Sequence, residues 1–291
     1  MVKIITDSIC DLDPAYLAPY DIDTMPLRVR LGDQEYLDKV EIDYMDVCRA
    51  MLEGVVPKST QVPADIMANT FEKCAAAGQD FIYVAFSSVL SGCCNLAQMM
   101  VAELKEKYPN VRMGVLNSKA GAAGMGLIVL QLAHMAKDGA PFEKLMKHGE
   151  YLREHIVHMI ALKDMKWLVL GGRINKLVGA ASTALDIRPL IHIDKEGYLK
   201  SFGTARGQKR MVKAICDKTL EKLKAFPEQL VAICYTYEQE TTHQTIAYLK
   251  EHLPQIKLVL QPVGSVLTSY LGLSGVGILF FDERPKEYYY N

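Results

Sequence analysis

The first half of the chain alternates short apolar runs with longer amphipathic stretches. Short runs that are apolar at almost every position are typical of strands covered on both faces, as in a parallel sheet. Such strands are predicted at 2–6, 81–86 and 112–117. Helices are predicted at 44–53, 63–77, 92–107, 121–137 and 141–157. This alternation predicts an α/β arrangement with a mostly parallel sheet.

The stretch TMPLRVRL at 24–31 alternates apolar and polar residues more regularly than the buried runs do. This alternation predicts an edge or hairpin strand. Gly32 and Asp33 follow it as polar turn residues.

The pattern changes from about residue 156. A strand is predicted at 157–164, followed by a short helical piece and a Gly-Gly-Arg turn. The runs 187–194 and 197–206 are separated by a turn short enough for a hairpin, which predicts antiparallel pairing. The remaining elements are predicted as a helix at 207–225, a strand at 230–237, a helix at 239–252 and strands at 256–263 and 276–282.

These two sequence patterns predict two α/β domains. The first, residues 1–157, has a mostly parallel sheet, and the second, residues 158–291, has a mixed sheet. No stretch rich in Pro, Gly or Ser marks a linker between them.

Composition narrows the class of protein. Half of the 291 residues are hydrophobic, 23% are charged and the formal net charge is −1, which is typical of a soluble globular protein. The absence of a basic block argues against nucleic acid or a membrane surface as the main partner. Neither a signal-peptide pattern nor an apolar run of membrane-spanning length is present, so a cytoplasmic protein is expected.

Cysteine spacing and glycine order argue against metals and cofactors. The seven cysteines show no CxxC spacing, which predicts reduced thiols and no metal site. The glycines at 121, 124 and 126 do not have the GxGxxG order of a dinucleotide site. We therefore expect no cofactor.

The stretch SSVLSGCCNLA at 87–97 joins a predicted strand to a predicted helix. The serine nucleophile of a hydrolase is expected in a GxSxG turn, and the residues around Ser91 do not have this pattern. The sequence also shows no histidine–acid pair that would activate the serine. Ser91 and a helix that begins at Gly92 can instead bind an anion, through the hydroxyl and the three unpaired N–H groups of Gly92, Cys93 and Cys94. Ser91 as a plain helix cap remains the alternative.

A second hydroxyl pair and two arginines are further candidates. Ser59 and Thr60 lie on the lead-in to the helix predicted from residue 63. Arg173 and Arg206 are each flanked by glycine, which leaves a guanidinium room to meet a carboxylate or phosphate.

The order of these motifs carries a family resemblance. The chain has TDSxxDL at 6–12, STQ at 59–61, SSxLSG at 87–92, GGRI at 171–174 and ARG at 205–207. This combination resembles the DegV family of bacterial fatty-acid-binding proteins over essentially the whole chain. The resemblance implies a two-domain α/β protein that is not itself an enzyme and that sequesters one long-chain fatty acid near the domain interface. It also implies a fatty acid kinase as partner, which phosphorylates the carboxylate for phospholipid synthesis. Nucleic acid is not expected as a partner, and membrane contact is expected to be transient at most.

The resemblance also implies roles for particular residues. The carboxylate would meet Ser59 or Thr60 and Ser91 with the Gly92 amide. Arg173 and Arg206 would lie near the headgroup and serve the kinase step. Ser269 and Tyr270 are likewise expected to face the ligand or the partner.

Two departures from the family pattern stand out. Tyr270, preceded by Ser269, occupies the position of a family histidine, and Cys93-Cys94 stand where the family commonly has Thr-Tyr. Tyrosine keeps a hydrogen-bonding group but does not titrate near neutral pH. A lipid carrier or sensor without kinase coupling is therefore the alternative, and a serine-dependent acyl hydrolase is a third.

Overall fold

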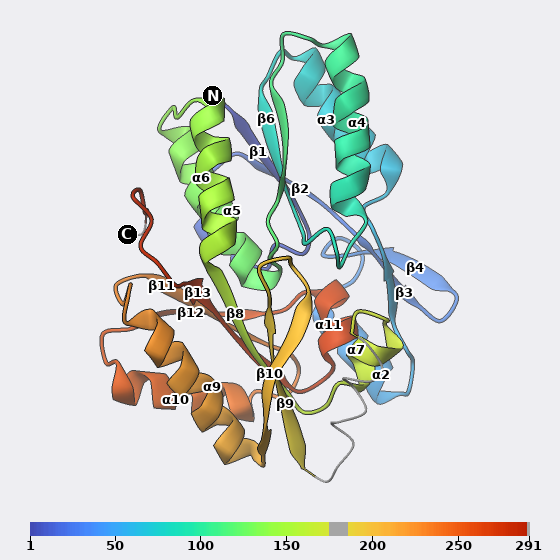
Figure 1. The fold of residues 1–291 in the computed structure, drawn as a ribbon. Coiled ribbons are helices and arrows are strands. Elements are labelled where there is room, and N and C mark those ends of the chain that lie inside the picture. The colour runs from blue at the N-terminus through green and yellow to red at the C-terminus, as the bar shows by residue number, and fades with distance from the viewer. Residues whose placement is uncertain (175–185, 290–291) are drawn as a thin grey trace.

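Two β-sheets with a layer of helices between them form the frame of the molecule (Figure 1). The structure is a computed structural model and describes residues 1–174 and 186–289. From one side to the other, the layers are a helix pair, a parallel sheet, a second helix pair, a mixed sheet and a third helix pair.

The parallel sheet has the strand order β2-β1-β6-β7. Its strands are β1 (Lys3–Asp7), β2 (Ile22–Met25), β6 (Phe81–Ala85) and β7 (Met113–Asn117). Helices α3 (Ala64–Ala76) and α4 (Cys93–Lys107) cover one face, and α5 (Ala122–Lys137) and α6 (Phe142–His155) cover the other. Every residue of β1 and β6 is buried as a result. The predicted helices and parallel strands of this half are confirmed.

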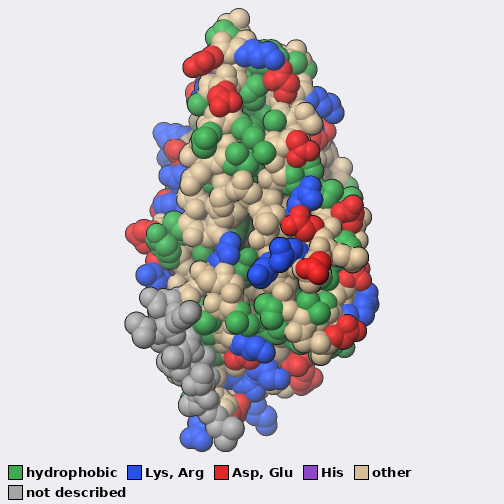
Figure 2. Space-filling view, turned by 90° about the vertical axis from the view of Figure 1, so that its right-hand side faces the viewer, with side chains coloured by type: hydrophobic (Ala, Val, Ile, Leu, Met, Phe, Trp, Pro, Cys, Tyr) green, Lys and Arg blue, Asp and Glu red, His purple; other side chains and the backbone are tan. Residues whose placement is uncertain are grey.

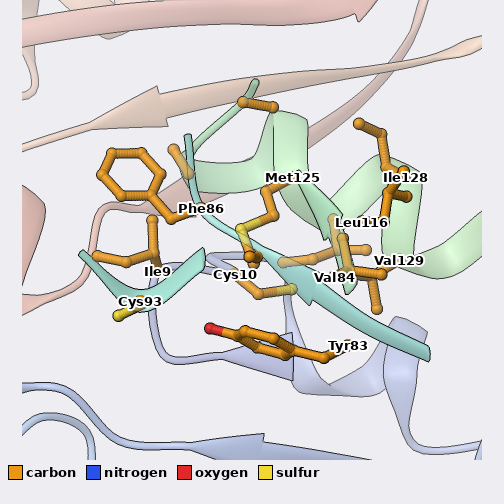
Figure 3. Packing of buried hydrophobic residues seen from close by; sticks show 14 of the residues in the cluster. Ile9, Cys10, Tyr83, Val84, Phe86, Cys93, Leu116, Met125, Ile128 and Val129 are labelled. Atoms are coloured by element: carbon orange, nitrogen blue, oxygen red, sulfur yellow. The ribbon is translucent and has the colours of Figure 1, made fainter. Parts of the chain in front are cut away.

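Helix α5 is buried on nearly all sides, because it contacts strands of both sheets. Figure 3 shows the packing on its inner side, where Val84 of β6 points toward Val129 of α5 and Tyr83 points away from that helix. A helix that is apolar all round is expected only where every face meets protein. Helix α5 therefore joins the two sheets.

The mixed sheet has the strand order β10-β9-β8-β13-β11-β12. Its strands are β8 (Ile156–Leu162), β9 (Ile187–Ile193), β10 (Leu199–Arg206), β11 (Leu230–Tyr235), β12 (Lys257–Pro262) and β13 (Gly275–Phe281). The predicted β9–β10 hairpin is confirmed, with antiparallel pairing from Leu199↔Ile193 to Arg206↔Ile187. Helices α9 (Gln208–Leu223) and α10 (Glu240–His252) cover the outer face.

Alternation along β8 separates the two faces of this sheet. Val157, Met159 and Ala161 belong to the hydrophobic core under α9 and α10. Successive side chains of a strand point to opposite faces, so the residues between these three point toward α5 and the interior of the molecule. The sheet begins directly after α6. The division into 1–157 and 158–291 stays a prediction.

The single strand predicted at 24–31 is wrong. The structure has β2 in the parallel sheet and β3 (Arg28–Leu31) in a separate sheet of order β4-β3-β5. Pro26 lies between them and, lacking an N–H, does not continue a ladder. Strand β4 (Gln34–Leu37) pairs with β3 across the predicted Gly32-Asp33 turn.

The lead-in loop predicted before residue 63 is also corrected. Residues 58–60 form strand β5 (Lys58–Thr60), which pairs with β3. Its sequence, KST, has no strand pattern of its own, so pairing with β3 determines its conformation. The shorter helices are α1 (Pro14–Leu17), α2 (Tyr44–Leu52), α7 (Lys166–Leu170) and α11 (Ser265–Leu271). None of the described helices is both long and apolar enough to cross a membrane.

Candidate functional site

An apolar cavity of about 230 Å³ lies between the inner face of the mixed sheet and the carboxyl ends of parallel strands. Ile9, which follows β1, and Phe86, which follows β6, line its parallel-sheet side. Ile160 and Leu279 line it from β8 and β13. Crevices at the carboxyl ends of parallel strands are the usual ligand sites of α/β folds.

The described lining is apolar apart from a few groups. Its polar side chains are those of Ser59, Thr60, Gln61, Ser91, His158, Arg173 and Thr236, together with Tyr235 and Tyr270, which carry hydroxyl groups. Within the described lining, Arg173 is the one permanent cation, and no carboxylate is present. Such a lining suits a ligand with a long apolar part and one anionic or polar end.

Two glycines of β13 make room for the cavity. Gly275, Gly277 and Leu279 alternate on the inner face of the strand, and all three line the cavity. A Cβ added at Gly277 would lie 3.4 Å from Leu279 Cδ1 and 3.7 Å from Cys234 Cβ, which is ordinary contact. Glycine inside a strand often marks a site where another group approaches closely. The alternating glycines at 275 and 277 are thus a signal in the sequence from which this wall of the cavity could have been found.

Three side chains meet at the polar end of the cavity. The Ser59 and Tyr270 hydroxyl oxygens are 2.7 Å apart, which is hydrogen-bonding distance. The Arg173 guanidinium lies 4.9 Å from the centre of the Tyr270 ring, in a cation–π contact, and its Nη1 donates to the Gly171 carbonyl. Gly171 is required here, because a Cβ would lie 2.3 Å from the Tyr270 ring.

Strand pairing sets the direction of the β5 side chains. Ser59 is paired with the fully buried Val29, and Thr60 is paired with Arg28 on the other face of the small sheet. Ser59 therefore points inward toward Tyr270, whereas Thr60 is exposed at the rim of the cavity. Of the two hydroxyls that the sequence offered, Ser59 is the one directed to the interior.

Ser91 lies at the start of α4, next to Gly92, which is the N-cap residue. Its Oγ accepts a hydrogen bond of 3.3 Å from the Cys93 N–H. This N–H is not free, so the predicted set of three unpaired N–H groups is corrected, and Ser91 helps to cap the helix. A Cβ at Gly92 would lie 2.3 Å from Gln61 Oε1, so the Gln61 side chain lies close against the start of the helix.

The cysteine pair at 93–94 has a structural role. Cys93 Sγ accepts a hydrogen bond of 3.4 Å from the Val62 N–H, which ties the start of α4 to the segment that follows β5. Burial raises the pKa of the Cys93 thiol to about 11, and it also raises the pKa of Cys94. These thiols therefore stay protonated and unreactive at neutral pH. All seven cysteines lie in the described ranges, and each is buried and free.

A buried carboxylate beneath the cavity holds the loops after β1 and β6. Asp7 accepts from the Tyr83 hydroxyl at 2.6 Å and from the Ile9 N–H at 3.0 Å, with a longer contact of 3.4 Å from the Phe86 N–H. Burial raises its pKa to about 6, although the three donors act in the opposite direction. Ser8 accepts from the Leu27 N–H. The TDS motif thus positions cavity loops and does not itself line the cavity.

Two predicted site residues lie away from the cavity lining. Arg206 is exposed at the end of β10. Ser269 is buried in α11, where its Oγ donates to the Ser265 carbonyl at 2.9 Å. One residue along a helix turns the side chain by about 100°, so Ser269 points away from the face that carries Tyr270. Their proposed roles stay predictions.

The structure adds Gln61, His158, Tyr235 and Thr236 to the polar residues of the cavity. His158 Nε2 lies 3.1 Å from the Gly121 carbonyl, and burial lowers its pKa to about 4, so the ring is neutral near pH 7. Within the described ranges, no histidine is hydrogen-bonded to Ser91, and no cluster of three potential metal ligands occurs. Figure 2 shows the face with α4, α7 and the β3–β4 hairpin, where a hollow lies near the middle with basic side chains beside it.

Known proteins match this chain over nearly its whole length. A family model described as "Uncharacterised protein, DegV family" matches residues 1–283. A DegV domain-containing protein of Clostridium perfringens is 30% identical over 287 residues, which cover 97% of this chain and 99% of the relative. A DegV domain-containing protein of Lactococcus lactis is 24% identical and covers 98% of this chain and 99% of the relative.

Solved structures share the fold. A stearic acid-binding protein from Eubacterium ventriosum aligns with a TM-score of 0.86 at 24% identity, over 96% of this chain and 98% of that chain. The Fatty Acid Kinase (Fak) B3 protein of Streptococcus pneumoniae, loaded with linoleic acid, aligns with a TM-score of 0.86 at 23% identity, over 97% and 100% of the two chains. At these identities the comparison establishes the arrangement of the two sheets and confirms the predicted α/β fold.

Proposed function

The chain belongs to the DegV family, and from this premise we propose that it binds one long-chain fatty acid in its cavity without transforming it. The observation that carries the proposal is the cavity itself, whose wall is apolar and whose polar groups gather mostly at one end. Solved structures of the same fold include a stearic acid-binding protein, a protein loaded with linoleic acid and a protein loaded with heptadecanoic acid. The proposed ligand therefore fits both the chemistry of the lining and its family.

Burial of the acyl chain supplies the affinity. Each methylene moved from water into an apolar site contributes about 0.8 kcal/mol, so about twelve methylenes provide roughly 10 kcal/mol before the costs of association. A buried carboxylate needs donors in compensation, because an unpaired charge in an apolar site is prohibitive. We assign that role to Ser59, Thr60, Ser91 and the Gly92 amide, all of which border the polar end.

We also propose that the protein presents the carboxylate to a fatty acid kinase. The similar fold of the Streptococcus pneumoniae Fatty Acid Kinase (Fak) B3 protein supports this step. Arg173 is exposed, borders the cavity and contacts the Tyr270 ring, so it can face both the ligand and a partner. Arg206, also exposed, is assigned to the partner surface. A cytoplasmic location, with transient membrane contact only, goes with this role.

A reconstituted kinase reaction tests the coupling. Protein loaded with oleate, mixed with a purified bacterial fatty acid kinase and ATP, is expected to yield acyl phosphate that hydroxylamine traps as the hydroxamate. Arg173→Ala is expected to slow this reaction at least tenfold, because a guanidinium beside the carboxylate stabilises charge that develops during phosphoryl transfer. Lys166→Ala, an exchange on nearby α7 outside the lining, is the control and should leave the rate unchanged.

The same experiment separates the alternatives. Protein that retains oleate but yields no acyl phosphate, even after Tyr270→His restores the residue that the family pattern expects, would identify a carrier without kinase coupling. Hydroxamate formed without kinase or ATP would instead indicate a serine-dependent acyl hydrolase, in which the serine forms an ester with the acid, water leaves, and hydroxylamine then takes up the acyl group.

A further inference from the structure

The hydrogen bond at the polar end of the cavity joins two elements that are far apart in the sequence. Ser59 lies on β5 of the small sheet β4-β3-β5, and Tyr270 lies on α11, which contacts both β3 and β5. Their hydroxyl oxygens are 2.7 Å apart, so a shift of either element by about 1 Å would break the contact. The site therefore depends on how α11 is held relative to the small sheet.

A lysine ammonium lies between the small sheet and the segment after β1. Lys39 follows β4, and its Nζ donates to Asp11 Oδ1 at 2.6 Å and to the Cys10 carbonyl at 3.1 Å. Only 1% of the Asp11 side chain is exposed. Asp11 is the second acidic residue of the TDSxxDL motif, after Asp7. The ion pair thus gives the second half of this motif a structural partner.

Helix α11 begins against this ion pair. Its N-cap residue is Gly264, where a Cβ would lie 2.8 Å from Asp11 Oδ1 and 3.0 Å from Lys39 Cε. Burial raises the pKa of Asp11, whereas the Lys39 ammonium and the Gly264 N–H act in the opposite direction. Glycine allows the first turn of α11 to approach the pair this closely. The helix that carries Tyr270 is therefore in contact with Asp11 and Lys39 at its start.

The backbone of Lys39 indicates that its side chain has a specific role. Its φ is 63°, in the left-handed region, which glycine and asparagine adopt at less cost than lysine does. Residues held in such conformations occur where the surrounding structure requires them. The contact of the ammonium with Asp11 accounts for a lysine at this position.

The segment after β1 also holds the strand next to Ser59. Ser8 Oγ accepts from the Leu27 N–H at 3.1 Å, and Val29, two residues further along, is paired with Ser59. One segment thus contacts the small sheet through Ser8 and the start of α11 through Asp11. Both partners of the hydrogen bond at the polar end are held from the same side.

We propose that Asp11 and Lys39 are positioning residues for carboxylate recognition, because their ion pair holds α11 where Tyr270 meets Ser59. The inference rests on the proposed function, since it concerns the polar end of the same cavity. Neither Asp11 nor Lys39 belongs to the described lining, so they act through α11. When the Tyr270 hydroxyl donates to Ser59 Oγ, the Ser59 proton is free to bond the ligand carboxylate.

Binding of a fatty acid and of its methyl ester tests the proposal. Full-length protein is stripped of lipid and titrated with oleic acid and with methyl oleate. Asp11→Asn/Lys39→Gly removes the ion pair without leaving a buried charge unpaired, and glycine suits the left-handed backbone of residue 39. We expect about tenfold or greater weakening for oleic acid, the effect of one hydrogen bond to a charged group. The affinity for methyl oleate should stay within about threefold.

Two single substitutions serve as controls. Lys3→Met removes a buried lysine of β1 that is paired with Asp21 and Asp23, outside the described lining, and should leave both affinities unchanged. Gly264→Ala keeps both charges of the pair but places a methyl group against Asp11. It should also weaken oleic acid more than methyl oleate, because it displaces the start of α11.

Each other outcome overturns the inference. A folded double variant that binds oleic acid as the wild-type does shows that the ion pair does not position the site. Equal weakening of acid and ester shows that the pair only supports the cavity wall. If the double variant does not fold, the same comparison on Gly264→Ala decides. Wild-type protein that binds no oleic acid shows that the proposed function fails together with the inference.

Discussion

Gly277→Leu is expected to weaken binding of long-chain fatty acids about 30- to 150-fold while the protein stays folded. The residue lies on the cavity face of β13, where only ordinary contacts surround an added Cβ. Three further carbon atoms must then extend into the space proposed for the acyl chain. They displace about three methylenes, at about 0.8 kcal/mol each, which corresponds to this range.

The effect should depend on chain length. A shorter fatty acid avoids the leucine side chain, so its affinity should fall much less, and the preferred length should decrease by about three carbons. Isothermal titration of the lipid-free variant with saturated acids of increasing length measures both effects. Gly277→Ala is the matched control, because one methyl group fits at 3.4 Å from Leu279 Cδ1 and should cost less than tenfold. Unchanged affinity for long chains in a folded Gly277→Leu protein would place the ligand elsewhere.

The double substitution Ser59→Ala/Ser91→Ala is expected to weaken fatty acid binding by at least about 100-fold. Hydrogen bonds to a charged group contribute about 1.5–3 kcal/mol each, and the two hydroxyls are assigned to the same carboxylate. Their effects should be non-additive, because both act on one group. Substitution of Ser59 has a second consequence, because the Tyr270 hydroxyl then loses its hydrogen bond to Ser59.

Two controls separate carboxylate recognition from loss of structure. Ser88→Ala changes a serine of the same loop whose Oγ accepts from Asn117 Nδ2, outside the cavity lining, and should leave affinity unchanged. The methyl ester of the same fatty acid should bind the wild-type weakly and lose less than tenfold on the double substitution. An equal loss for acid and ester would show that the two serines support the fold and do not recognise the charge.

The elements that could be predicted from the sequence are those whose burial makes their residues almost all apolar. Strands β1 and β6 are covered on both faces by helices and read as apolar runs, and α5 is apolar because it contacts two sheets. Strand β5 has no apolar pattern, because its three residues are polar and at least partly exposed. Its strand conformation results from pairing with β3. Local pattern fails where tertiary pairing decides the conformation.

Some residues of the candidate site could be predicted from the sequence, and others could not. Ser59 and Ser91 were predicted from hydroxyl clusters at element ends, and the structure brings both to one cavity. Gln61 and His158 were missed as cavity residues, because neither the loop nor the strand pattern shows which side chains face an interior space. Ser269 was predicted beside Tyr270 from sequence adjacency, but helical geometry turns it away.

Native mass spectrometry of the purified, untreated protein shows whether the chain binds one long-chain fatty acid. We expect a complex of one chain with one ligand, which on denaturation and organic extraction yields a carboxylic acid with a long acyl chain. Gly277→Leu protein prepared in parallel should carry less of this ligand or a shorter one. Protein that is free of lipid and still fails to take up any long-chain fatty acid added in excess would show that the cavity does not bind fatty acids.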